Sequence, residues 1–85
     1  MRIKPDDIKK GTIFYESAYG QNVQYEALDE PHTVEVVIGE DQGPRTQWHW
    51  QAKNLATQEI TDFTVTAGME HYGPQIYSEP AYYCP

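Results

Sequence analysis

Cysteine is almost missing from this sequence of 85 residues, in which Cys84 is the only one. A single cysteine excludes an intramolecular disulfide and a cysteine-based zinc site, and it is typical of a reducing compartment. Long apolar runs are missing too, and none follows the opening Met-Arg-Ile-Lys-Pro-Asp-Asp. We therefore expect no signal peptide, no membrane-spanning segment and a cytoplasmic location.

Basic residues are scarce, with 6 lysines and arginines against 13 acidic residues and a net charge of -7. Binding to a nucleic-acid backbone requires a basic patch, and an anionic membrane surface attracts polybasic segments. The charge therefore argues against direct nucleic-acid binding and against a membrane partner. It favours a protein partner with a basic surface, or it serves solubility alone.

Motifs that carry chemistry are also missing. The sequence has no phosphate-binding glycine loop and no nucleophile elbow. Its three histidines, His32, His49 and His71, do not have the spacing of a metal motif. Paired carboxylates such as Asp6-Asp7 lie where turns are expected. We predict that the protein is not an enzyme and has no catalytic residue, cofactor or metal.

The strongest positive signal is the alternation in residues 46–52. Trp48, Trp50 and Ala52 fall on one face of an extended strand, while two glutamines and His49 fall on the other. Both tryptophans of the protein lie here, and few side chains bury more surface. We expect this strand to carry the core.

Other stretches are rich in β-forming residues and predict four more strands, at 12–18, 23–28, 32–38 and 59–66. In the third predicted strand, Val34, Val36 and Ile38 are expected to face inward, with Thr33 and Glu35 facing outward. Helical periodicity does not extend beyond about two turns. The fold class is therefore mostly β: a small antiparallel five-stranded meander, curled as an SH3-like barrel, with an OB-like barrel as the alternative.

The two ends differ from this body. Residues 1–11 predict a short turn at Pro5–Ile8, with Ile3 and Ile8 as inward anchors. Residues 67–85 hold four tyrosines and three prolines, which predict an extended arm, with Ile76-Tyr77 adding a short edge strand. We expect Tyr72 and Tyr77 to close the barrel. The whole chain, 1–85, is read as one domain with a body at 12–66.

Two resemblances bear on this reading. Ala27-Leu28-Asp29, the two tryptophans and 80–83 resemble SH3 motifs, but their spacing excludes a proline-peptide-binding SH3 domain. Lys-Lys-Gly-Thr-Ile-Phe-Tyr-Glu, Gln-Trp-His-Trp-Gln-Ala and Glu-His-Tyr-Gly-Pro-Gln-Ile-Tyr are similar to segments of small uncharacterised phage and prophage proteins with an SH3-like β-barrel. That resemblance implies a phage context and a barrel, and it rests on no catalytic motif.

Acidic residues dominate the stretch from Gly11 to Pro44, which has no lysine or arginine. The acids there are Glu16, Glu26, Asp29, Glu30, Glu35, Glu40 and Asp41. In a meander, the three within strands would share one outward face. That face would serve as a docking surface for a basic partner, or it would protect the sheet edge and keep the protein soluble. Tyr82 and Tyr83, near the C-terminus, form a second candidate contact surface.

These features favour a non-enzymatic protein-interaction module, such as a phage or prophage accessory protein that binds or inhibits a host factor. The first alternative is an acidic nucleic-acid mimic that blocks a DNA- or RNA-binding protein. The second is a structural component of a virion or a homo-oligomer, in which the tyrosine-rich arm docks on a neighbour. All three hypotheses place the contacts on the acidic residues or on the arm.

Overall fold

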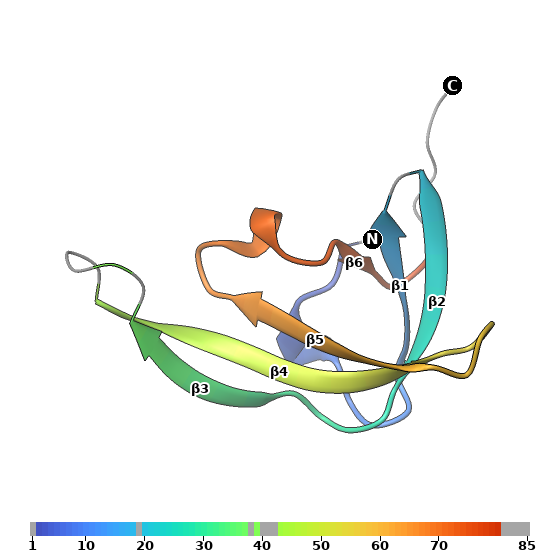
Figure 1. The fold of residues 1–85 in the computed structure, drawn as a ribbon, viewed down its shortest axis with the longest axis horizontal. Coiled ribbons are helices and arrows are strands. Elements are labelled where there is room, and N and C mark those ends of the chain that lie inside the picture. The colour runs from blue at the N-terminus through green and yellow to red at the C-terminus, as the bar shows by residue number, and fades with distance from the viewer. Residues whose placement is uncertain (1, 19, 38, 40–42, 81–85) are drawn as a thin grey trace.

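The computed structural model describes residues 2–18, 20–37, 39 and 43–80, and its fold is mostly β, as predicted (Figure 1). The strands are β1 (Ile13–Ala18), β2 (Gln21–Ala27), β3 (His32–Val37), β4 (Pro44–Asn54), β5 (Ile60–Thr66) and β6 (Ile76–Tyr77). Two short 3₁₀ turns accompany them, η1 (Pro5–Asp7) and η2 (Glu70–Tyr72). The sheet is antiparallel and curled, which confirms the predicted class.

β4 is the central strand; one strand pairs with one of its edges, and two strands pair with the other. On one edge β5 pairs along residues 47–53 of β4. On the other edge β3 pairs with residues 44–49 and β2 with residues 52–54. The sheet continues from β2 to β1 and then to β6. The predicted meander, with β2 beside β3, is wrong in this respect, because these two strands follow one another along the same edge of β4.

The bend between β2 and β3 explains this arrangement. Between the pairs Ala27–Ala52 and His32–His49 the chain advances five residues on the bent side but only three on β4. The extra residues form a bulge that turns the strand away from the body. Pro31 lies in this bulge, where its missing N–H costs no ladder hydrogen bond. β2 and β3 therefore act as one long strand with a bend.

An aromatic cluster forms the core. Trp50 stacks on Phe63, with ring centroids 5.3 Å apart and planes at 13°, and Phe14 lies edge-on to Phe63 at 5.2 Å. Tyr25 stacks on Phe14 at 5.6 Å. Trp50 and Ala52 are buried, and the partly buried Trp48 packs against the same cluster. The predicted inward face of the Trp strand is confirmed.

The orientation predicted for β3 is wrong. Val34 pairs with Gln47 and so lies on the outer face, whereas Glu35 pairs with Thr46 on the face that carries Trp48. Ile38 lies outside the described residues. Alternation shows which residues share a face, but not which face meets the core. β3 runs past the end of β5, so part of it has no core opposite.

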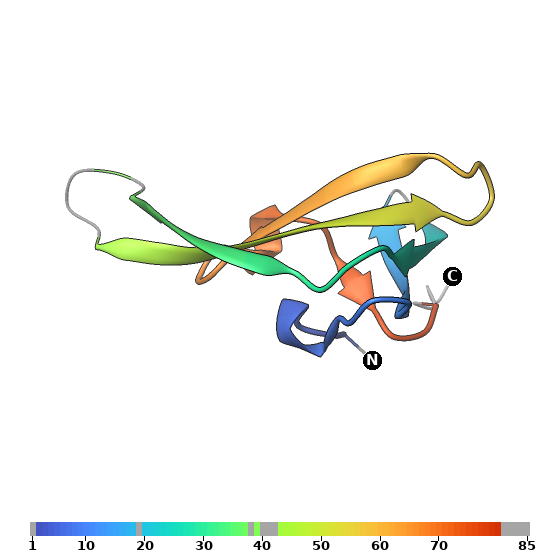
Figure 2. The same cartoon turned by 90° about the horizontal axis from the view of Figure 1, so that it is seen from below.

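The N-terminal segment covers the concave side of the sheet, as Figure 2 shows. Ile8 is 1% exposed and Ile3 packs against the core, so both predicted anchors are confirmed. At the other end, β6 pairs with β1 as the expected short edge strand. Tyr72, by contrast, is 77% exposed, so the prediction that it closes the barrel is wrong.

The β3–β4 hairpin extends away from the rest of the sheet and gives the molecule its long axis (Figure 1). The radius of gyration is 13.6 Å, whereas a compact chain of this length has about 12 Å. The principal extents are 40 × 32 × 20 Å. Within the described segments, no helix is long and apolar enough to cross a membrane.

Candidate functional site

The acidic residues within the strands do not share a face. Glu26 lies on the outer face, directly opposite Lys53 of β4. Glu35 lies on the other face, where the Thr46 hydroxyl donates a hydrogen bond to its Oε1 at 3.0 Å. Because β2 and β3 are not neighbours, no row of carboxylates crosses the sheet as the predicted meander required.

Glu16 is also turned away from the outer face. It pairs with Val23 and lies on the same side of β1 as the buried Phe14. Its half-buried carboxylate accepts a hydrogen bond from Tyr25. Burial raises the pKa of Glu16, and the hydrogen bond from Tyr25 lowers it by less. Glu16 therefore lies at the edge of the core and not on the outer face where it was expected.

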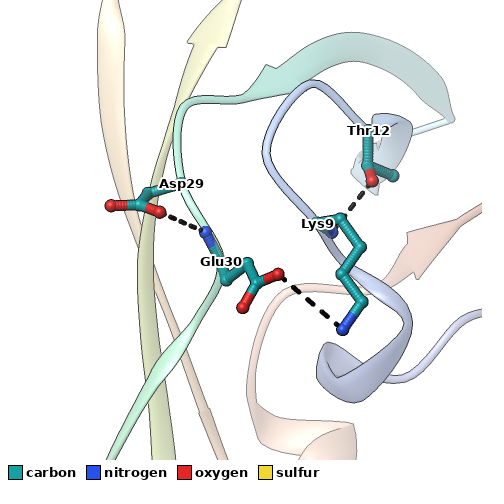
Figure 3. A network of polar contacts seen from close by, with 4 residues as sticks. All are labelled: Lys9, Thr12, Asp29 and Glu30. Carbon is teal, nitrogen blue, oxygen red and sulfur yellow. Dashed lines mark hydrogen bonds and ion pairs between the residues drawn. The ribbon is translucent and has the colours of Figure 1, made fainter.

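Asp29 and Glu30 lie in the bend between β2 and β3. The Glu30 N–H donates to Asp29 Oδ1 at 2.8 Å, and this hydrogen bond stabilises the turn (Figure 3). Lys9 Nζ lies 3.9 Å from Glu30 Oε1, and both side chains are mostly exposed. Figure 3 draws this ion pair beside the bend. Exposed pairs of this kind contribute about 0–1 kcal/mol. The carboxylates of Asp29 and Glu30 are therefore exposed to solvent at the bend, and the weak ion pair with Lys9 does not prevent Glu30 from meeting another cation.

A hollow of about 600 Å³ lies between this bend and the β4–β5 pair. Three carboxylates line it, Asp29 and Glu30 from the bend and Asp62 from β5. His32 and His49 line it as well. Among the described residues, no lysine or arginine belongs to its lining. We call this feature the acidic hollow, and its lining carries net negative charge.

The two histidines of the acidic hollow stack on each other, with ring centroids 5.6 Å apart and planes at 19°. They are cross-strand partners of β3 and β4. The two stacked rings therefore lie side by side on the outer face of β3 and β4, where both line the hollow. Flat π-systems of this kind also accept a stacked guanidinium group.

Hydrogen bonds hold His49 in one orientation. Gln47 Nε2 donates to Thr66 Oγ1 at 3.0 Å, which leaves Gln47 Oε1 facing His49 Nε2 at 2.7 Å. His49 must therefore donate from Nε2, and its Nδ1 lies 3.2 Å from the Thr64 hydroxyl. Both ring nitrogens of His49 have hydrogen-bond partners, so its ring is held in place in the lining of the hollow. Neither nitrogen is left without a partner to coordinate a metal ion.

A second concavity, of about 690 Å³, lies on the opposite side of the sheet. Trp48 and Val65 line it together with residues 2–6 of the N-terminal segment and with η2. Trp48 Nε1 donates to Asp6 Oδ1 at 3.0 Å. The charges around it are of both signs, including Arg2, Lys4 and Glu70. Unlike the acidic hollow, this groove has no single electrostatic preference.

Four of the acidic and tyrosine residues named from the sequence fall in parts of the chain that the structure does not describe. Tyr82 and Tyr83, the predicted contacts of the arm, lie outside the described residues, as do Glu40 and Asp41. In the part of the chain that the structure describes, no group of three or more His, Cys, Asp or Glu side chains is placed to hold a metal ion.

Comparison of the chain with protein-family models, with curated proteins and with solved structures gives no match in any of the three.

Asp62, His32 and His49 are polar members of the acidic hollow that the sequence pattern did not single out as contacts. The alternation that buries Phe63 and Val65 does place Asp62 on the outer face. The residue opposite Asp62, however, is decided by the register of β4 against β5. That residue is Gln51, whose Nε2 donates a hydrogen bond to Asp62 Oδ1 at 2.9 Å. Only the pairing of β4 with β5 brings Asp62 beside the bend residues.

Proposed function

We propose that this chain is a non-enzymatic protein-interaction module that binds a basic segment of a partner protein in the acidic hollow. The observation that carries the proposal is the convergence of Asp29, Glu30 and Asp62 on one concavity with no cationic lining residue. In a phage or prophage setting, the partner would be a cytoplasmic host factor that the module binds or inhibits.

Electrostatics supports a cationic ligand. The net charge of -7 attracts a basic partner from a distance and raises its association rate at low salt. Within the hollow, a lysine or arginine of the partner would meet the three carboxylates, and a guanidinium group would also stack on the His32–His49 pair. The partner's cation would compete with Lys9 for Glu30.

The nucleic-acid mimic is not supported in the same way. Such a mimic presents carboxylates in a row that imitates phosphates along a strand. Glu26 lies on the outer face, while Glu16 and Glu35 lie on the other face of the sheet. Binding of a basic segment requires only the three carboxylates that line the acidic hollow, those of Asp29, Glu30 and Asp62.

A hexa-arginine peptide is a suitable probe. We expect it to bind the full chain at low salt, with chemical shift changes concentrated at the bend, at the two stacked histidines and at Asp62. The triple variant Asp29→Asn/Glu30→Gln/Asp62→Asn should bind about tenfold more weakly, from roughly 0.5 kcal/mol for each lost charge pair. A hexa-glutamate peptide should not bind.

A matched control separates the site from net charge. Glu16→Gln/Glu35→Gln/Glu79→Gln removes the same three charges from positions outside the hollow, and its affinity for the peptide should fall much less. Lys9→Ala should strengthen binding, because it frees Glu30. Equal weakening by the two triple variants would show that only overall charge is sensed, and the proposal would then be wrong.

A further inference from the structure

β3 is an edge strand with little of the usual protection. Among the described residues it pairs only with β4. Val34 is 40% exposed and Val37 is 71% exposed. The strand contains no lysine, no arginine and no proline, and Glu35 is its only carboxylate. Natural edge strands are normally blunted by lysine, proline or a covering element, because their free N–H and C=O groups invite another strand.

The edge of β5 is different. Gly73 lies against the backbone carbonyl of Thr64, so the segment that follows β5 turns back over it. The edge of β3, in contrast, runs along the hairpin that extends away from the body (Figure 1). Of the edges of β3 and β5, that of β3 is therefore the one that a second strand can approach with less obstruction.

We propose that β3 pairs with β3 of a second copy of this chain, in antiparallel orientation, and joins the two sheets into one. A strand paired with its own copy about a two-fold axis places identical sequences in opposite directions. An apolar, nearly uncharged strand is suited to this, whereas two acidic strands would repel each other.

The charges select one register. A two-fold axis perpendicular to the sheet requires paired residues to share a face, so Val34 faces His32, Val34 or Val36 of the second copy. Pairing with Val36 would place Glu35 opposite Glu35, which is unfavourable. If Val34 pairs with His32, only residues 32–34 of the two strands lie opposite each other. If Val34 pairs with Val34, residues 32–36 of the two strands pair, and each Glu35 lies opposite Thr33 of the other copy.

Sedimentation velocity tests the pairing. An interface made by one added strand is small, so we expect the sedimentation coefficient of the full chain to rise between about 10 µM and about 1 mM. Val34→Lys places two lysines together at the two-fold axis and should keep the chain monomeric throughout. Ile60→Lys is the matched control, since Ile60 is 61% exposed on the other edge strand, and it should associate like the parent chain. Circular dichroism confirms that both variants are folded.

Cross-linking tests the register. In a Cys84→Ser background, with oxidised glutathione as the oxidant, Val34→Cys should form an intermolecular disulfide readily, because directly opposed residues have Cα atoms about 4.5–5.5 Å apart. Val37→Cys lies at the end of the strand and should cross-link at least tenfold more slowly. Faster cross-linking at position 37 would overturn the register.

Two results would overturn the pairing itself. One is a chain that stays monomeric over the whole concentration range, in which case the edge is left for a strand of a different protein. The other is association that Val34→Lys leaves unchanged. Neither result bears on the acidic hollow, because no substitution in these experiments alters Asp29, Glu30 or Asp62.

Discussion

The indole Nε1 of Trp48 donates a hydrogen bond to Asp6 Oδ1 at 3.0 Å, across 42 positions of sequence. This bond ties the N-terminal segment to the central strand. Trp50, two residues further on and on the same face, has no hydrogen-bond partner for its Nε1 among the described residues, although it is only 3% exposed. The two tryptophans thus have different structural roles.

The Trp48–Asp6 bond predicts an energetic coupling between the two side chains. We expect a double-mutant cycle with Trp48→Phe and Asp6→Ala, measured by urea unfolding, to give a coupling free energy of about 1 kcal/mol. Trp48→Phe keeps most of the apolar contact, so it isolates the loss of the N–H donor. Additive effects of the two substitutions would show that the bond does not contribute to stability.

At Trp50 we expect the free energy of unfolding to depend strongly on the size of the side chain and only weakly on its N–H group. Trp50→Ala should lower the free energy of unfolding by about 3–5 kcal/mol, because it removes the ring that stacks on Phe63. That is a large part of the stability of a small domain. Trp50→Phe should cost far less, since the lost volume is offset by removal of a buried donor without a partner. Thermal and urea denaturation measure both, and equal losses would contradict the prediction.

We expect substitution of Glu16 to raise the stability of the fold by an amount that depends on pH. Burial raises its pKa above the ordinary value of 4.5, so the folded state holds the proton more tightly than the unfolded chain does. The ionised carboxylate therefore costs stability at neutral pH, and this cost disappears as pH falls through the raised value toward 4.5. Glu16→Gln should be more stable than the parent at pH 7, with the difference vanishing near the acidic end of that window.

Urea unfolding at a series of pH values measures this difference. Glu79→Gln, at an exposed position, controls for the loss of one negative charge from the molecule. A Glu16→Gln variant that is less stable than the parent at pH 7 would mean that the hydrogen bond from Tyr25 outweighs the burial of the carboxylate.

Gly68 predicts a backbone constraint beside Arg45. Its φ is +80°, and a Cβ there would meet the Arg45 guanidinium group, which donates to the Ala67 carbonyl at 3.1 Å. Gly68→Ala should therefore lower the free energy of unfolding by about 1–2 kcal/mol. Gly43→Ala, with open space around its Cβ position, is the control and should change stability by less than about 0.5 kcal/mol. In an Arg45→Ala background, the remaining cost of Gly68→Ala measures the backbone strain alone.

The sequence predicted local structure well where alternation was strict. The Trp strand, with Trp50 and Ala52 inward, needed only period-two patterning and the area of the aromatic rings. Both isoleucine anchors of the N-terminal segment followed from their position around a proline-initiated turn. These are local signals, because burial and dihedral preference are expressed within a few residues.

The sequence failed where the answer depended on which strands are neighbours. The orientation of Val34 could not be predicted, since period two fixes a shared face but not the side on which the core lies. The expected acidic face failed for the same reason: it assumed that β2 and β3 pair, whereas the bulge at the bend sends both onto one edge of β4.

By itself the sequence determined the class of the fold, the aromatic strand at its centre and the net negative charge. The tertiary structure decided which carboxylates meet, since Asp29 and Asp62 come from segments that only the register of β4 brings together. It also decided that β3 is an edge with exposed valines. Strand pairing is a long-range choice, made by backbone hydrogen bonds that every residue offers alike, so side-chain pattern alone does not specify it.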